Sequence, residues 1–183
     1  MSRALACGVL CARIVAHPYT PYCPTFTYVG RHRYFLTFVA YQRLEKFTTS
    51  IVVTMVLEQI VRAAKEKEFE VIVYCFMPDH VHLVVEGLSN RADLKMFVKV
   101  GKQYSGFYYK RAQSGTLWQH GQNDHIIRDD VDLLDRVRYV VNNPVAAGLV
   151  ARPQDYPFLG SQRWSTPELI EWCQPRGAHG SPA

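Results

Sequence analysis

The sequence lacks long apolar runs and an ordered cysteine pattern. None of its continuous apolar runs reaches ten residues, whereas a helix needs about 20 to cross a bilayer. The five cysteines are scattered and odd in number, and they include no CxxC pair. This usage argues against a zinc finger and against a disulfide framework. A reducing compartment is the simplest interpretation, so we expect a cytoplasmic protein with no membrane partner.

Acidic residues are the minority among the charged side chains. The 183 residues include 16 acids and 21 lysines and arginines, which gives a formal net charge of +5. An excess of this size permits a nucleic-acid or phosphate partner without proving one. Apolar residues make up 48% of the chain, which is enough for a hydrophobic core, and the length is that of one ordinary domain.

The chain divides into three segments by composition. Residues 1–30 contain three prolines in a Tyr/Thr-rich stretch without acids, which predicts an extended or poorly ordered leader. Residues 31–165 carry the regular apolar patterns and are expected to form the one folded domain, which holds all the candidate site residues described below. Residues 166–183 end in a Gly/Pro/Ser-rich run and are expected to form a C-terminal tail.

The apolar patterns predict a fold of the α+β class. Strands are expected at residues 34–41, 70–77 and 80–86, with shorter ones at 117–119 and 125–128. Pro78-Asp79 forms the turn of a tight hairpin between the second and third strands. This order, with helices between the strands, predicts a ferredoxin-like sandwich with a central antiparallel sheet and helices on one face.

Three amphipathic helices are expected at residues 48–67, 89–111 and 130–143. Thr48 or Thr49 can cap the first helix and Ser89 or Asn90 the second. Pro144 is expected to end the third, because proline cannot continue a helix. The buried stripe of the second helix is predicted to comprise Leu94, Phe97, Val98, Gly101, Ser105 and Tyr108.

His80 and His82 are one residue apart in a predicted strand. Residues i and i+2 of a strand point to the same face, so the two imidazoles project side by side. So placed, each can give one nitrogen to a shared divalent metal. The pattern also fits two surface histidines on a half-exposed strand, and alone it does not separate these interpretations.

Tyr139 and Asn143 are one turn apart on the third predicted helix and can reach the same point. A phenol is a competent nucleophile only when its oxyanion is stabilised, because its free pKa is near 10. The Asn143 amide offers an oxygen as a third metal ligand. The same residues also fit a tyrosine at the core boundary and an ordinary helix cap.

Basic residues line one face of the second predicted helix, at the spacing i, i+4, i+8 and i+11. Such a stripe can neutralise the phosphates of a DNA strand, or it is simply a solvated surface. Tyrosines nearby can stack on unpaired bases or fill the core. The residues of the stripe are Arg91, Lys95, Lys99 and Lys102.

A polar cluster precedes the third helix and supplies secondary site candidates. His125 can lie near the metal or orient a phosphate, and Arg128 and Arg136 are basic neighbours. Tyr104 and Tyr109 are alternative nucleophiles, because each lies on a helix that follows the histidine strand.

These segments together resemble the HUH single-tyrosine transposases. More narrowly, they resemble the REP-associated tyrosine transposases, a family linked to repetitive extragenic palindromes. The resemblance covers Arg33 to Ser161, in the family's order and spacing. The matching segments are YFLTFVAY, CFMPDHVHLVVEG, LWQHGQNDHIIRDDVDL, RYVVNNPVAAGLV and DYPFLGS.

The resemblance implies an activity and a role for each site residue. His80 and His82 would bind the metal, Tyr139 would be the nucleophile, and Asn143 would complete the metal site. The implied enzyme nicks single-stranded or hairpin DNA through a 5′-phosphotyrosine and transfers the strand during transposition. Mg²⁺ prefers oxygen ligands and Mn²⁺ also accepts imidazoles, so either ion is expected.

Two other functions remain open from the sequence. The first is a domesticated, catalytically inactive protein that binds DNA or RNA. The second is a small-molecule metallohydrolase, against which the basic helix and the lack of a third strong ligand beside the histidines count. Related single-tyrosine enzymes include dimers in which one subunit's tyrosine helix serves the other's histidines. We favour a monomer, with a dimer as the alternative.

Overall fold

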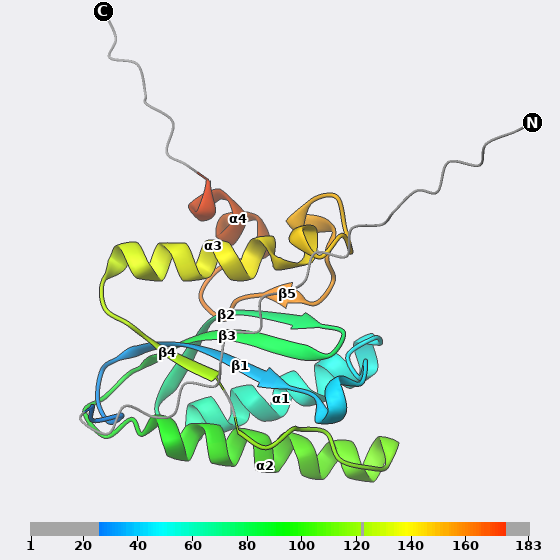
Figure 1. The fold of residues 1–183 in the computed structure, drawn as a ribbon. Coiled ribbons are helices and arrows are strands. Elements are labelled where there is room, and N and C mark those ends of the chain that lie inside the picture. The colour runs from blue at the N-terminus through cyan, green and yellow to red at the C-terminus, as the bar shows by residue number, and fades with distance from the viewer. Residues whose placement is uncertain (1–25, 122, 175–183) are drawn as a thin grey trace, which may run out of the picture.

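A five-stranded antiparallel sheet forms the centre of the computed structural model, which describes residues 26–121 and 123–174 (Figure 1). Its strand order is β4-β1-β3-β2-β5. The hairpin of β2 and β3 turns at Pro78-Asp79, as predicted. The strands are β1 (Arg33–Val39), β2 (Phe69–Met77), β3 (His80–Gly87), β4 (Asn123–Ile127) and β5 (Leu159–Gly160).

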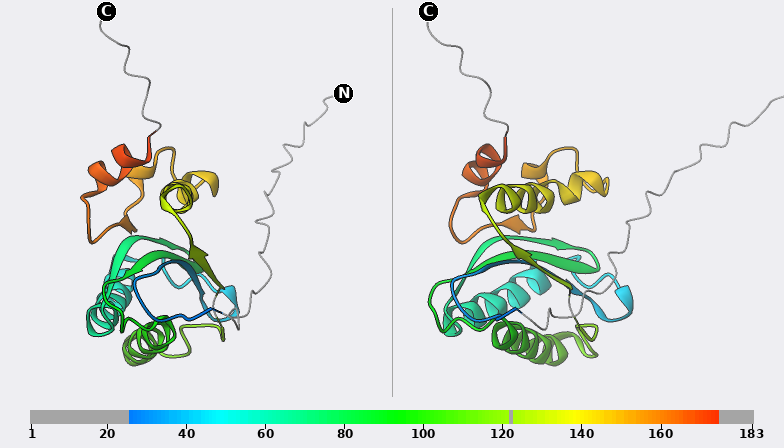
Figure 2. Two further views of the ribbon diagram at one scale, coloured as in Figure 1. Left: turned by 90° about the vertical axis from the view of Figure 1, so that its left-hand side faces the viewer. Right: turned by 60° about the vertical axis from the view of Figure 1, so that its left-hand side comes forward.

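Helices cover both faces of this sheet, as the edge-on views of Figure 2 show. Helices α1 and α2 lie side by side on one face, and α3 and α4 lie on the other. Two short 3₁₀ turns, η1 (Tyr41–Arg43) and η2 (Pro153–Asp155), connect elements. The helices are α1 (Ser50–Glu66), α2 (Leu94–Gln113), α3 (Asp130–Ala146) and α4 (Thr166–Cys173).

The prediction of an α+β fold around a central antiparallel sheet is confirmed. The order β4-β1-β3-β2 makes β1 parallel to β2 and β3 parallel to β4, so α1 and α2 are both crossover helices. Such crossovers are right-handed, which places both helices on the same face. The expectation of helices on one face alone is wrong, because α3 and α4 shield the apolar residues of the opposite face.

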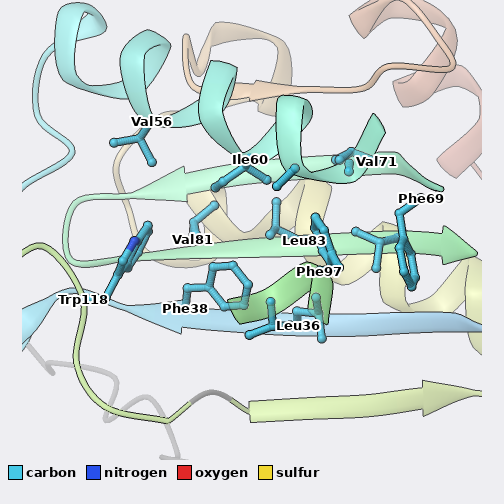
Figure 3. Close-up of a cluster of buried hydrophobic side chains, with 14 of the residues drawn as sticks. Leu36, Phe38, Val56, Ile60, Phe69, Val71, Val81, Leu83, Phe97 and Trp118 are labelled. Atoms are coloured by element: carbon cyan, nitrogen blue, oxygen red, sulfur yellow. The ribbon is translucent and has the colours of Figure 1, made fainter. Parts of the chain in front are cut away.

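Alternation along the strands produces two separate cores. In β1, Tyr34, Leu36 and Phe38 are buried toward α1 and α2, while Phe35 and Thr37 face α3. Figure 3 shows the larger core between the sheet and the first two helices, where residues such as Leu83, Ile60 and Phe97 converge.

The smaller core lies between the sheet and helices α3 and α4. Leu133, Val137, Val140 and Val141, which share one face of α3, are buried there. Leu169 of α4 is fully buried in the same core.

The folded domain extends beyond the expected limits of residues 31–165. Tyr28 is buried in the larger core, and residues 166–173 form α4 rather than the start of a tail. Residues 1–25 of the expected leader and 175–183 of the expected tail lie outside the described residues.

Two helix ends differ from the predictions. Asp93 caps α2 by accepting from the Met96 backbone N–H, so neither Ser89 nor Asn90 is the cap. The prediction that Tyr108 belongs to the buried stripe of this helix is also wrong, because Tyr108 is exposed and Tyr109 is buried instead.

Helix α3 continues through Pro144 to Ala146, so the proline does not end it. The helix stops in a Schellman motif, in which Gly148 donates to Val145 and Leu149 donates to Pro144. Gly148 has φ of +71°, the left-handed conformation that this motif requires. No helix among residues 26–121 and 123–174 is both long and apolar enough to cross a membrane.

Candidate active site

The two histidines of β3 lie next to each other beneath α3. Their strand alternates, so Val81, Leu83 and Val85 enter the larger core while both imidazoles face the other side. His80 is 7% exposed and His82 is 4% exposed. The alternative of two surface histidines on a half-exposed strand is therefore wrong.

The inner nitrogens of this pair face each other. Nε2 of His80 lies 3.0 Å from Nε2 of His82. Each outer nitrogen has its own partner: Nδ1 of His80 lies 2.5 Å from Oδ1 of Asp79, and Nδ1 of His82 lies 3.0 Å from Oγ1 of Thr37. An ionised carboxylate only accepts hydrogen bonds, so Asp79 holds the proton on His80 Nδ1.

The electrostatic surroundings keep this pair suited to a cation. Burial, followed by the neighbouring charge of His80, lowers the pKa of His82 well below its ordinary value, so its imidazole is neutral near pH 7. The hydrogen bond from His80 and the guanidinium of Arg43 lower the pKa of Asp79, which stays ionised. A carboxylate behind a histidine fixes the ring and raises the basicity of the far nitrogen.

These donors fit a divalent metal. The two Nε2 atoms are 3.0 Å apart, so a proton or a cation between them can be shared by both rings. Two ligands at right angles, each about 2.1 Å from a metal, are themselves about 3 Å apart. Among the described residues, no group of three His, Cys, Asp or Glu side chains is placed to hold a metal. A further protein ligand would therefore have to be of another type, such as an amide.

Tyr139 lies directly beside the histidine pair. Its ring is edge-on to His82, with 5.4 Å between centroids, and edge-on to Phe35, at 5.7 Å. Phe35 in turn stacks on His82 at 5.4 Å. Tyr139 is 44% exposed although both partners lie below it, so a large substrate can reach the ring.

The pairing of β1 with α3 sets the position of Tyr139 over the sheet. Arg33 at the start of β1 pairs with Asp130 at the start of α3. From Arg33 to Thr37 the strand rises about 13 Å, and from Asp130 to Tyr139 the helix rises by about the same length. Tyr139 therefore lies level with Thr37, whose cross-strand neighbour is His82. Asn143 lies one helical turn beyond Tyr139 on α3 and is half-buried.

The secondary candidates gather around Asp132, on the β4 side of Tyr139. Asp132 Oδ2 lies 3.1 Å from His125 Nε2, and its Oδ1 accepts from Arg136 Nε at 3.1 Å. Arg128 contributes its backbone N–H to the same carboxylate. The structure thus brings the His125 and Arg136 side chains together through Asp132, a residue that the sequence did not single out, while Arg128 joins them through its backbone alone.

The basic stripe lies on the opposite face of the sheet from Tyr139, because α2 packs beside α1. Arg91 precedes the helix and pairs with Glu68. Lys95 and Lys99 are exposed. Lys102 is instead turned inward, where its Nζ donates to the backbone carbonyls of Gln119 and Gly121.

The alternative nucleophiles are also on that opposite face. Tyr104 donates to Glu66 at 2.9 Å, and Tyr109 is buried beside Lys46. The sheet separates both from His80 and His82.

Besides Asp132, three contributors to the site were missed in the sequence. Asp79 had a detectable signal, because it directly precedes His80 in the turn. Thr37 and Phe35 had none, because they reach His82 only through the pairing of β1 with β3.

Residues 28–142 match the model of the family described as transposase IS200 like. The chain belongs to this family. The match covers the sheet strands β1 to β4, the histidine pair and the tyrosine of α3. The matched region of this IS200-like transposase ends at residue 142, one residue before Asn143.

Two relatives extend the comparison. Over 142 residues the chain is 27% identical to a Haemophilus influenzae protein whose curated name places it among the REP-associated tyrosine transposases, covering 71% of this chain and 80% of that protein. A solved REP-associated tyrosine transposase bound to a REP hairpin has the same fold, with a TM-score of 0.68 and 22% identity. That likeness covers 85% of this chain and 88% of the other.

Proposed function

We propose that this transposase nicks and rejoins single-stranded DNA at palindromic hairpins, with Tyr139 as the nucleophile. The observation that carries the proposal is the contact of the Tyr139 ring with His82, whose Nε2 faces that of His80. A nucleophile and a cation-binding pair within one small surface region suit the transfer of a phosphate. The solved relative is bound to a REP hairpin, and we propose a substrate of the same class.

The reaction begins when the Tyr139 oxygen attacks a backbone phosphorus. A phosphorus–oxygen bond to the phenol forms, and the bond to the 3′ oxygen breaks. The phenol proton is lost and the departing 3′ oxygen gains one, so no net charge is created. The 5′-phosphotyrosine retains the energy of the original bond, so a 3′-hydroxyl can reverse the step or accept the strand without ATP.

Mg²⁺ or Mn²⁺ would be held by His80 and His82, with the amide of Asn143 as the third protein ligand. When bound, the ion would polarise a phosphate oxygen and so favour attack by the phenol. Asp79 and Thr37 would fix the two ring orientations.

The nucleophile and both histidines come from the same chain, so a monomer contains the whole proposed site. The basic residues Arg91, Lys95 and Lys99 lie on the face of the sheet opposite Tyr139. They would therefore contact only a part of the DNA that extends around to that face. We assign Lys102 a role in the fold rather than in DNA binding, because its amine is held by two carbonyls.

The decisive experiment incubates a labelled hairpin with the protein and Mn²⁺ and resolves the products on a denaturing protein gel. Labelled DNA that migrates with the protein supports the proposal. A shift seen only in native gels would indicate a binding protein that has lost catalysis. Cleavage without an adduct would indicate attack by water and would contradict the role of Tyr139.

A further inference from the structure

Beside Tyr139, three polar side chains form a compact group on the exposed edge between β4 and α3. His125 belongs to β4, whereas Asp132 and Arg136 lie one turn apart on α3. Nη2 of Arg136 lies 3.3 Å from His125 Nε2, and both side chains contact the Asp132 carboxylate. The carboxylate therefore fixes a guanidinium and an imidazole side by side.

This group adjoins the nucleophile through a single ring. The guanidinium of Arg136 lies over Phe35, 5.9 Å from its centroid, and Tyr139 packs edge-on against the same ring. His125 is the cross-strand partner of Phe35 on β4. With strands about 4.8 Å apart, the group lies on the β4 side of Tyr139, away from His80.

The chemistry of the group suits an anion. Asp132 accepts from Nε of Arg136. When His125 Nε2 donates to Asp132 it cannot also accept from Nη2 of Arg136, and no described residue bonds Nη1. The His125 side chain is 44% exposed and that of Arg136 is 33% exposed, while Asp132 beneath them is 21% exposed. Arginine presents planar donors that match phosphate oxygens. Because the Asp132 carboxylate already holds the Arg136 side chain, that side chain loses less conformational entropy when it binds a phosphate.

We propose that Arg136 and His125 form a subsite for the DNA phosphate that neighbours the one attacked by Tyr139. Asp132 is a positioning residue, because it acts by holding the other two. Occupation of this subsite would fix the register of the strand over the phenol. The inference rests on the proposed function and adds the point at which the flanking strand is anchored.

The test measures binding in a Tyr139→Phe background, which has no nucleophile and therefore does not depend on cleavage. In a series of hairpins, one phosphate at a time is replaced by a neutral methylphosphonate. Each is titrated with this protein and with the additional Arg136→Gln substitution, in the presence of Mn²⁺. One neutral linkage should weaken binding to the first protein by about tenfold, the size expected for losing a charged hydrogen bond.

A methylphosphonate at that same linkage should hardly weaken hairpin binding by the Arg136→Gln protein, because the arginine that contacts this phosphate has already been removed. Identical profiles for the two proteins at every linkage would overturn the inference. His125→Gln, on a different element, should reduce the effect at the same linkage and so provides a second test. Arg62→Gln is the matched control, because Arg62 also pairs through Nε with a carboxylate one helical turn away, on α1 across the sheet.

Failure of the proposed function has a separate signature. Adduct formation by the protein with Tyr139 intact is measured on the unmodified hairpin. If no adduct forms but the Arg136-dependent linkage is found, the subsite stands and catalysis by Tyr139 does not. If the adduct forms but no linkage depends on Arg136, catalysis stands and the subsite is wrong.

Discussion

The imidazole of His82 and the phenol ring of Tyr139 meet edge to face, with 5.4 Å between centroids and 72° between ring planes. The two residues belong to β3 and α3, which lie against each other across the smaller core. The contact exists because α3 covers this face of the sheet. It places the proposed nucleophile beside the proposed cation site with no movement of the backbone.

Replacing either histidine of the pair should weaken metal binding. In His80→Ala and His82→Ala proteins, Mn²⁺ affinity should fall at least tenfold, the lower limit for disturbing a metal shell. Because both imidazoles are buried, each change should also cost about 0.5–3 kcal/mol in the free energy of unfolding. Calorimetric titration with Mn²⁺ measures the first effect and urea unfolding the second.

His125→Ala is the control, because His125 lies on β4 and contacts neither histidine of the pair in the described structure. It should retain full Mn²⁺ affinity. Unchanged affinity in the His80, His82 double variant would refute the metal assignment.

The exposed lysines of α2 are predicted to act only through charge. If DNA passes over this face, Lys95→Ala and Lys99→Ala should each reduce the salt dependence of single-strand binding by about 0.7, the value per phosphate contact. Lys102→Ala should leave this slope unchanged, because its amine is bonded to backbone carbonyls. Equal slopes for the parent, Lys95→Ala and Lys99→Ala proteins would place the DNA elsewhere.

Lys102 should make stability depend on pH in a definite direction. Burial lowers its pKa from 10.5 to about 8, so between these values the unfolded chain binds more protons than the folded one. Stability from this residue therefore rises as pH increases from 8 to 10.5, and its burial cost is greatest below pH 8.

Urea unfolding of the parent and Lys102→Met proteins at pH 7 and pH 10 isolates this effect. The free energy of unfolding of the parent should rise relative to the variant by about 2 kcal/mol between the two conditions. A difference that stays constant with pH would show that the lysine titrates normally.

Local periodicity predicted the faces of individual elements but not their placement on the sheet. The i, i+2 spacing put His80 and His82 on one face, and the helical spacing put Tyr139 and Asn143 one turn apart. The spacing of Lys95 and Lys99 defined a face of α2 without showing that the sheet separates it from Tyr139. Once the strand order is known, the right-handedness of the crossovers places α1 and α2, and with them these lysines, on the same face of the sheet.

Long-range pairing explains the remaining differences. Asp132 gathers His125 and Arg136 only because β4 joins the edge of β1 beside α3. Pro144 lacks one backbone donor close to the end of α3, and the hydrogen bonds made by Gly148 and Leu149 beyond it keep the last turn closed. Such effects depend on neighbours that a sequence window does not contain.

Tyr139→Phe removes one oxygen and keeps the ring that packs on His82 and Phe35. Hairpin binding and the free energy of unfolding should therefore stay close to those of the parent protein. Cleavage and the covalent adduct should both disappear, because no phenol remains to attack the phosphate. A variant that still cuts DNA would require a different nucleophile.

The most direct measurement is mass spectrometry of the adduct trapped with the parent protein, hairpin DNA and Mn²⁺. After proteolysis and nuclease digestion, the nucleotide should be found on Tyr139, in the peptide that contains Arg138 and Val140. A nucleotide on Tyr104 or Tyr109, or the absence of any adduct while the DNA is cut, would contradict the assignment of Tyr139 as the nucleophile.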